Sequence, residues 1–192
     1  MMMASPLEDR RRALEESFFS KKNQQLLDAL REELSQADRK QALSTAAQID
    51  DDRTLDLLVQ ADISVESLLA FKLVPLVEVA WADASIAQSE REAILAAAES
   101  KGSRPSDVAY QLLQNWLAEP LTEDLKLAWR SYANGLVEYL GADECAAIRT
   151  EVLGKAREVA QSAGGILGIG NKISPVEARV MAELEEALGG GD

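Results

Sequence analysis

Histidine is absent from the 192 residues of this chain, and cysteine occurs once, as Cys145. Without imidazole the chain lacks the commonest general base and the usual nitrogen ligand of zinc and iron, which argues against most hydrolase and transition-metal mechanisms. No motif supports another nucleophile, so we expect a protein that is not an enzyme. Cys145 falls in a predicted helix and has no partner for an internal disulfide, so we expect a buried thiol in an intracellular protein.

Aromatic residues are scarce, at 5%, although hydrophobic residues make up 47% of the chain. The core must therefore be built from leucine, alanine, valine and isoleucine, and such a composition favours packed helices. No segment shows the sustained alternation of β-branched or aromatic residues that predicts strands. We expect an all-α fold, a multi-helix bundle.

Positive charge is also in short supply, because 20 lysines and arginines stand against 33 acids, for a formal net charge of −13. Such a chain repels a phosphate backbone, so nucleic acid is not expected as a partner. Long hydrophobic runs are missing too, and no stretch approaches the roughly 20 apolar residues that cross a bilayer. We expect a soluble, cytoplasmic chain without a membrane span or a signal peptide.

Apolar residues recur every three or four positions along most of the chain, which predicts a series of amphipathic helices. Helix-capping residues, glycines and prolines place helices at about 38–48, 64–80, 88–100, 107–118, 142–162 and 175–188. A further helix, with Thr122 as its N-cap, has the clearest period, carried by Leu125, Trp129, Tyr132, Leu136 and Tyr139.

The expected helix from Ser64 to Ala80 is almost wholly apolar, so we place it at the centre of the core. Pro75 removes a backbone donor inside this pattern and predicts a kink, and a break near Val74 is the competing interpretation. Upstream, the three aspartates at 50–52 could bind a metal. Aspartate is favoured at helix starts as N-cap and as partner of the helix dipole, so capping is the preferred interpretation.

The N-terminal part contains a long amphipathic helix, expected from Leu7 to Leu34, with a narrow apolar stripe against a densely charged face. Such a helix either packs on the bundle or projects and binds itself or another protein. In the second case, Phe18 and Phe19 are the candidate contact residues. We divide the chain into a charged helical extension (1–62), a helical bundle (63–188) and a disordered tail (189–192).

A glycine-rich, apolar loop is expected between the last two helices, at residues 164–172. Its glycine spacing resembles a phosphate-binding loop, but Asn171 stands where the lysine belongs and a helix rather than a strand precedes it, which excludes that motif. Either the loop packs against the core, or its apolar residues, Ile166, Leu167 and Ile169, bind a partner.

Two acids flank one predicted helix junction, Asp83 in the turn and Glu90 at the start of the next helix. With Ile86 between them, they match the second half of an EF-hand calcium loop. The first half is missing and Ala84 stands where the tight-turn glycine belongs, so a standard EF-hand is excluded. Asp83 and Glu90 remain candidate ligands of a weakly bound divalent cation.

The alternative interpretation of both acids is structural. Ser174 and Glu177 form a capping box with Pro175 at the first helical position, and Glu90 takes the same place in its own segment as Glu177. Helix initiation then explains Glu90, and an Asx-turn that closes the preceding helix explains Asp83.

The acidic turn also carries a family resemblance. Asp83, Ile86 and Glu90, entered from the apolar segment at 73–81, resemble the TerB-like, tellurite-resistance-associated helical family of bacteria, and the similarity in helix order runs from about Ser64 to Leu188. The chain departs from the family pattern at Ala84, where the family usually has glycine, and at Gly170, where the second copy lacks an acid three residues before Ile173. Its N-terminal residues 9–19 resemble the opening helix of the ATP synthase inhibitor called the zeta subunit.

The resemblance implies an all-α bundle of two similar halves that takes part in stress-response systems, often as a partner of membrane proteins. It also implies that the acidic turn, here Asp83 and Glu90, binds a divalent cation. We therefore expect a non-enzymatic helical interaction module that binds a protein partner or itself, without a cofactor or with a weakly bound divalent cation. Cation binding or sensing at Asp83 and Glu90 is the alternative function.

Overall fold

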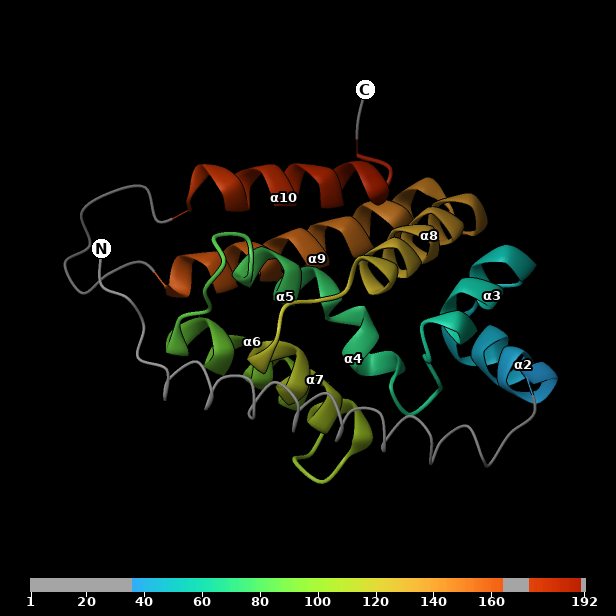
Figure 1. Cartoon of the computed structure of the whole chain (residues 1–192). Coiled ribbons are helices and arrows are strands. Elements are labelled where there is room, and N and C mark those ends of the chain that lie inside the picture. Colours follow the sequence, from blue (N-terminus) through green and yellow to red (C-terminus); the bar gives the residue numbers. More distant parts are fainter. Residues whose placement is uncertain (1–35, 164–172, 191–192) are drawn as a thin grey trace.

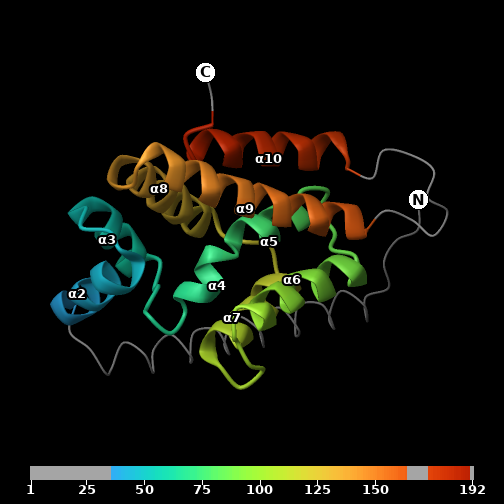
Figure 2. The same cartoon turned by 180° about the vertical axis from the view of Figure 1, so that it is seen from behind.

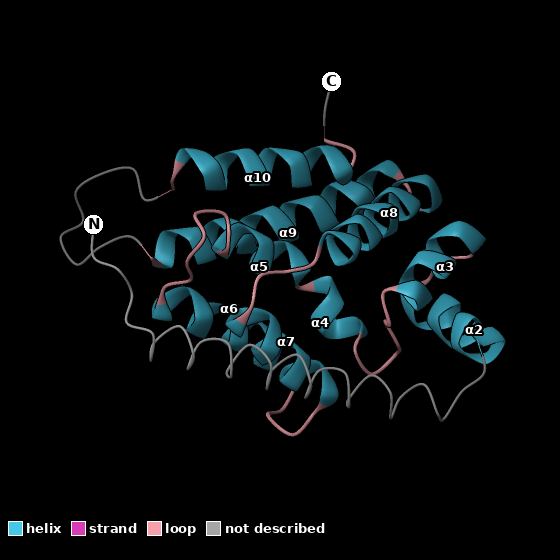
Figure 3. Ribbon diagram, viewed as in Figure 1, coloured by secondary structure: helices cyan, strands magenta, loops and turns pink. Residues whose placement is uncertain are grey.

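The computed structural model describes residues 36–163 and 173–190, and in these ranges it contains nine α-helices and no strand. The prediction of an all-α bundle is confirmed (Figure 3). The predicted N-terminal helix with Phe18 and Phe19 lies outside the described residues, and so does the glycine-rich loop with Ile166, Leu167 and Ile169.

The helix boundaries follow the expected capping residues closely, except in the segment 64–80. The helices are α2 (Gln36–Ala47), α3 (Asp52–Gln60), α4 (Leu68–Lys72), α5 (Val74–Ala80), α6 (Gln88–Ser100), α7 (Val108–Ala118), α8 (Glu123–Tyr139), α9 (Ala142–Ser162) and α10 (Pro175–Ala187). None of these helices has the length and apolar character that crossing a membrane requires.

The helices pack in layers around α5. In Figure 1, α10 lies along α9 on one side of the molecule, α6 and α7 lie on the opposite side, and α5 runs between them. The view from behind shows α2 and α3 together at one end of the bundle, beside α8 (Figure 2). The short helix α5 thus contacts α4, α6, α8, α9 and α10, and all seven of its residues are buried.

The segment expected as one helix from Ser64 to Ala80 is broken, and that expectation is wrong. The first part, α4, begins only after Ser67, and the chain turns at Leu73, where φ is −95° and ψ is 0°. The competing interpretation, a break near Val74, is confirmed. The physical reason is Pro75, which would clash with the preceding turn inside a helix but is tolerated in the first turn of α5, where no backbone donor is needed.

Helix capping confirms two further predictions. The carboxylate of Asp51 accepts a hydrogen bond of 2.6 Å from the backbone N–H of Thr54. The side chain of Thr54 and then this N–H lower the pKa of Asp51 by hydrogen bonding. The hydroxyl of Thr122 accepts from the N–H of Leu125 at 3.3 Å. Asp51 is therefore the N-cap of α3, which is the preferred interpretation of the aspartates at 50–52.

The apolar period of α8 is confirmed over most of its length, since Leu125, Trp129, Tyr132 and Leu136 are buried. Tyr139 is the exception and is 59% exposed, because it is the last residue of the helix and its side chain lies in solvent. Cys145 is half-buried, not buried as expected, because it lies in the exposed first turns of α9.

Helices α2 and α3 fall within the predicted extension 1–62, and both contribute buried side chains to the common core, including Leu43, Leu55 and Leu58. A glycine lets α3 approach α8 closely. A Cβ atom at Gly135 would lie 3.2 Å from the hydroxyl oxygen of Thr54.

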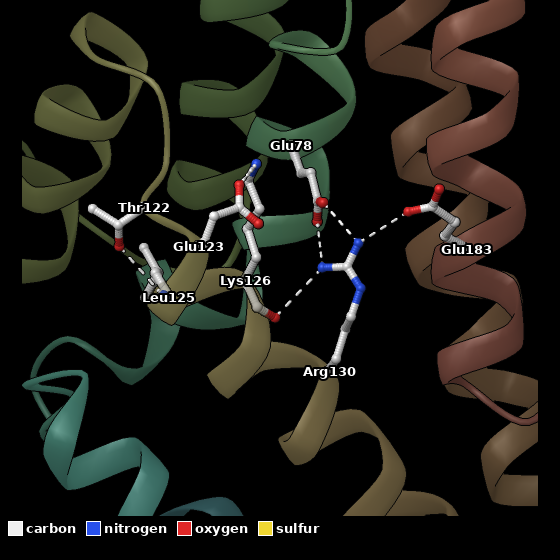
Figure 4. Close-up of polar contacts among 7 residues, drawn as sticks. All are labelled: Glu78, Thr122, Glu123, Leu125, Lys126, Arg130 and Glu183. Carbon is white, nitrogen blue, oxygen red and sulfur yellow. Dashed lines mark hydrogen bonds and ion pairs between the residues drawn. The ribbon is translucent and has the colours of Figure 1, made fainter.

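An ion-pair network joins α5, α8 and α10 (Figure 4). Arg130 on α8 donates to both carboxylate oxygens of the buried Glu78 on α5, at 2.8 and 3.4 Å, and to Glu183 on α10 at 3.3 Å. Burial disfavours the charge of Arg130, but the hydrogen bonds and charges of Glu78 and Glu183 outweigh burial and raise the pKa of Arg130. The network neutralises the one charged side chain that α5 carries into the core.

We predict that Arg130→Met lowers the free energy of unfolding by about 2–4 kcal/mol, because Glu78 is left nearly buried and unpaired. Removing both charges, in Glu78→Met/Arg130→Met, costs less than the single change, since no isolated charge remains. Urea denaturation measures each value.

Lys126→Met on the same helix is the matched control, because it removes only the exposed pair with Glu123. That pair is worth about 0–1 kcal/mol. Equal losses in Arg130→Met and Lys126→Met would contradict the assigned role of the network.

Candidate functional site

The turn between α5 and α6 places Asp83 on the surface. Its carboxylate accepts from the backbone N–H and the hydroxyl of Ser85, both at 3.4 Å, which is the Asx-turn predicted from the sequence. Ala84 follows with φ +67°, a left-handed conformation that costs about 1 kcal/mol for a residue other than glycine. The backbone at Ala84 thus has a left-handed shape that glycine adopts without strain. At the base of the turn, the indole N–H of Trp81 donates to the carbonyl of Trp116 at 2.9 Å.

Glu90 initiates α6. Its side chain is only 3% exposed, and its carboxylate accepts from the backbone N–H of Ala87 at 2.8 Å. Because Ala87 has no side-chain acceptor, Glu90 supplies the side-chain half of the capping interaction alone. The capping interpretation of Glu90 is confirmed.

The same arrangement recurs at the start of α10. The hydroxyl of Ser174 accepts from the N–H of Glu177 at 3.1 Å, while the carboxylate of Glu177 accepts from the N–H of Ser174. The predicted capping box is therefore confirmed, and Glu177 is 6% exposed.

The charge of Glu177 also acts on Glu90. Burial raises the pKa of Glu90, the N–H of Ala87 opposes this shift, and the charges of Glu177 and Asp83 add to it. The sequence places the two glutamates at equivalent positions of a partial repeat but does not reveal that the charge of one acts on the other. The only indication in the sequence is that both glutamates occupy the same capping position at the start of a helix. In a bundle of two similar halves, such equivalent positions can lie close together.

The acids of this turn are therefore engaged with backbone N–H groups. Within 36–163 and 173–190, no group of three or more histidine, cysteine, aspartate or glutamate side chains is arranged to hold a metal ion. A cation between Asp83 and Glu90 would need further oxygens from the backbone or from water. Metal binding at these two residues stays a prediction.

A second feature, which we call the lysine pocket, is an apolar opening of about 250 Å³ between α4, α8 and α9. Its exposed lining residues are all polar and include Lys72, Lys101 and Lys155, whereas its apolar lining residues are buried or half-buried. Tyr132 also lines it, and burial raises the pKa of Tyr132 to about 12, so the hydroxyl stays protonated at neutral pH. No local motif predicts this pocket, because its residues come from helices far apart in the sequence.

No protein-family model matches this chain, and comparison with curated proteins and with solved structures likewise found no match. The TerB-like assignment therefore stays a prediction based on the acidic turn and its flanking helices.

We predict that Glu90→Gln becomes relatively more stable than the wild type as the pH rises. The folded protein raises the pKa of Glu90 above the ordinary value of 4.5. Between pH 4.5 and the raised pKa, the folded state binds more protons at Glu90 than the unfolded state does. The stability that this group contributes is therefore fully present below pH 4.5 and is lost as the pH rises through the raised pKa. Glutamine cannot titrate but still accepts from the N–H of Ala87.

Urea denaturation over a series of pH values from acid to neutral measures the difference between variant and wild type. Glu92→Gln, on the exposed face of the same helix, is the control and should leave the pH profile of the wild type unchanged. A Glu90→Gln difference that is constant with pH would refute the assigned cause.

Proposed function

We propose that this chain is a non-enzymatic helical interaction module that binds a protein partner or a second copy of itself. On the basis of the TerB-like resemblance, we further propose that the module takes part in bacterial stress response and that a membrane protein is among its candidate partners. The observation that carries the proposal is that α8 exposes two large apolar side chains, Leu127 at 60% and Tyr139 at 59%.

These two side chains differ from the rest of the helix. The apolar residues of the predicted stripe at 125–136 are buried and stabilise the core. Leu127 and Tyr139 contribute little to the core because their side chains are exposed. Covering a large apolar side chain by a partner is favourable, and tyrosine is enriched where binding energy concentrates at interfaces. The capping roles of Glu90 and Glu177 support the same proposal, because they give these acids a structural task in place of catalysis.

We predict that the full chain self-associates and that Leu127→Lys/Tyr139→Lys weakens the association at least tenfold, which corresponds to about 1.4 kcal/mol. Sedimentation velocity over a concentration series measures it. Val65→Lys, at an apolar residue that is 42% exposed outside α8, is the matched control and should associate like the wild type. A chain that is monomeric throughout the series, or a double variant that associates like Val65→Lys, would contradict self-association through α8.

Cation binding at the acidic turn is the second candidate function, and one specific observation favours it. Burial is the main reason why the pKa of Glu90 is raised, and the negative charges of Glu177 and Asp83 raise it further, so three acids contribute negative charge to this junction. A divalent cation near Asp83 and Glu90 would relieve that repulsion.

Calorimetric titration with calcium, magnesium, manganese and zinc decides this candidate. We predict heat of binding in the wild type that disappears in Asp83→Ala and persists in Asp107→Ala. Asp107 is a suitable control because its carboxylate also accepts a backbone N–H in a turn, that of Arg104 at 2.9 Å. Absence of heat with millimolar metal would remove the candidate.

A further inference from the structure

The lysine pocket concentrates positive charge in an otherwise acidic protein. Three lysines and one glutamate, Glu151, are the charged residues of its lining, while the whole chain carries a net charge of −13. Below this rim the walls are apolar, with Trp129, Leu136 and Val152 among them. A pocket with apolar walls and a few convergent polar groups is the usual form of a small-molecule site.

The three lysines are not equivalent. Lys101 pairs with Glu151 at 2.6 Å, and Lys155 pairs with Glu158 at 2.8 Å. Lys72 forms no ion pair with any acid of the described ranges, and the charge of Lys101 acts on it repulsively. Surrounding protein atoms lower the pKa of Lys72, and the charge of Lys101 lowers it further. An anion beside Lys72 would form the ion pair that no acid within 36–163 and 173–190 forms with it.

We propose that the lysine pocket binds a small amphiphilic carboxylate, a medium-chain fatty acid, with its alkyl chain against the apolar walls and its carboxylate beside Lys72. The volume of about 250 Å³ sets the size of the ligand. It falls slightly below the range of about 300–1,000 Å³ found for drug-sized ligands, so one chain of roughly eight to ten carbons is appropriate. An amphipathic helix would instead require an apolar groove that extends over several helical turns.

Calorimetric titration of the full chain with decanoate, below its micellar concentration, tests this proposal directly. We expect binding that weakens about fourfold for each methylene removed, through octanoate to hexanoate. Decylammonium, which has the same chain with the opposite charge, should not bind.

Three variants separate the contributions of charge and shape. Lys72→Met keeps the length of the side chain and should weaken decanoate binding about tenfold or more, as expected for the loss of a charged hydrogen-bond donor. Lys126→Met, outside the pocket, should bind like the wild type. Val152→Trp fills the pocket from its half-buried wall and should abolish binding, and a thermal melt confirms that this variant is folded.

Several results would overturn the proposal. One is the absence of binding heat with all three carboxylates. Another is decylammonium binding as tightly as decanoate, and a third is a decanoate affinity that is unchanged in Lys72→Met. Occupation of the lysine pocket by a second protein chain would also overturn the proposal. In that case decanoate would bind only after dilution separates the chains, and Val152→Trp would lower the sedimentation coefficient at high protein concentration. The α8 double variant should bind decanoate like the wild type, so a failure of self-association is distinguishable from a failure of this site.

Discussion

The complete burial of α5 is the constraint on which the rest of the structure depends. A helix of seven residues gains little stability from its own hydrogen bonds, so it persists because five other helices cover it. Its residues are apolar except Glu78, and a buried carboxylate is tolerable only when it is paired. Arg130 supplies that pair from α8, and its second ion pair, with Glu183, reaches α10, so two ion pairs of one arginine connect three helices.

The two ends of α5 position the two candidate sites. Its N-terminal end follows the break at Leu73, which leaves Lys72 at the rim of the lysine pocket while Leu76 lines the interior. Its C-terminal end leads into the turn of Asp83 and on to Glu90. A single central helix thus separates a positive, apolar opening from a negative junction. Substitutions that shift α5 should therefore affect both sites together, whereas substitutions at either rim should act locally.

Local chemistry made most of the fold predictable. Asp51, Thr122 and Ser174 mark helix starts because their side chains satisfy backbone donors that no helix can satisfy itself, and the structure confirms all three. The candidate acids were also found, because caps have a characteristic spacing. What the sequence did not reveal depends on proximity in three dimensions. This holds for the charge of Glu177 that acts on Glu90, and for the three pocket lysines, which come from α4, from the residue after α6 and from α9. The break before Pro75 remained open because a kink and a break have the same local signal.

Native-state hydrogen exchange of the backbone amides of α5 tests the central claim most directly. If surrounding helices hold α5, the amides of Val77, Val79 and Ala80 can exchange only when the whole bundle opens. Their exchange should then report the same free energy as global unfolding and should respond fully to urea. Exchange of these amides through a local opening, with a free energy well below the global value and little dependence on urea, would contradict the account.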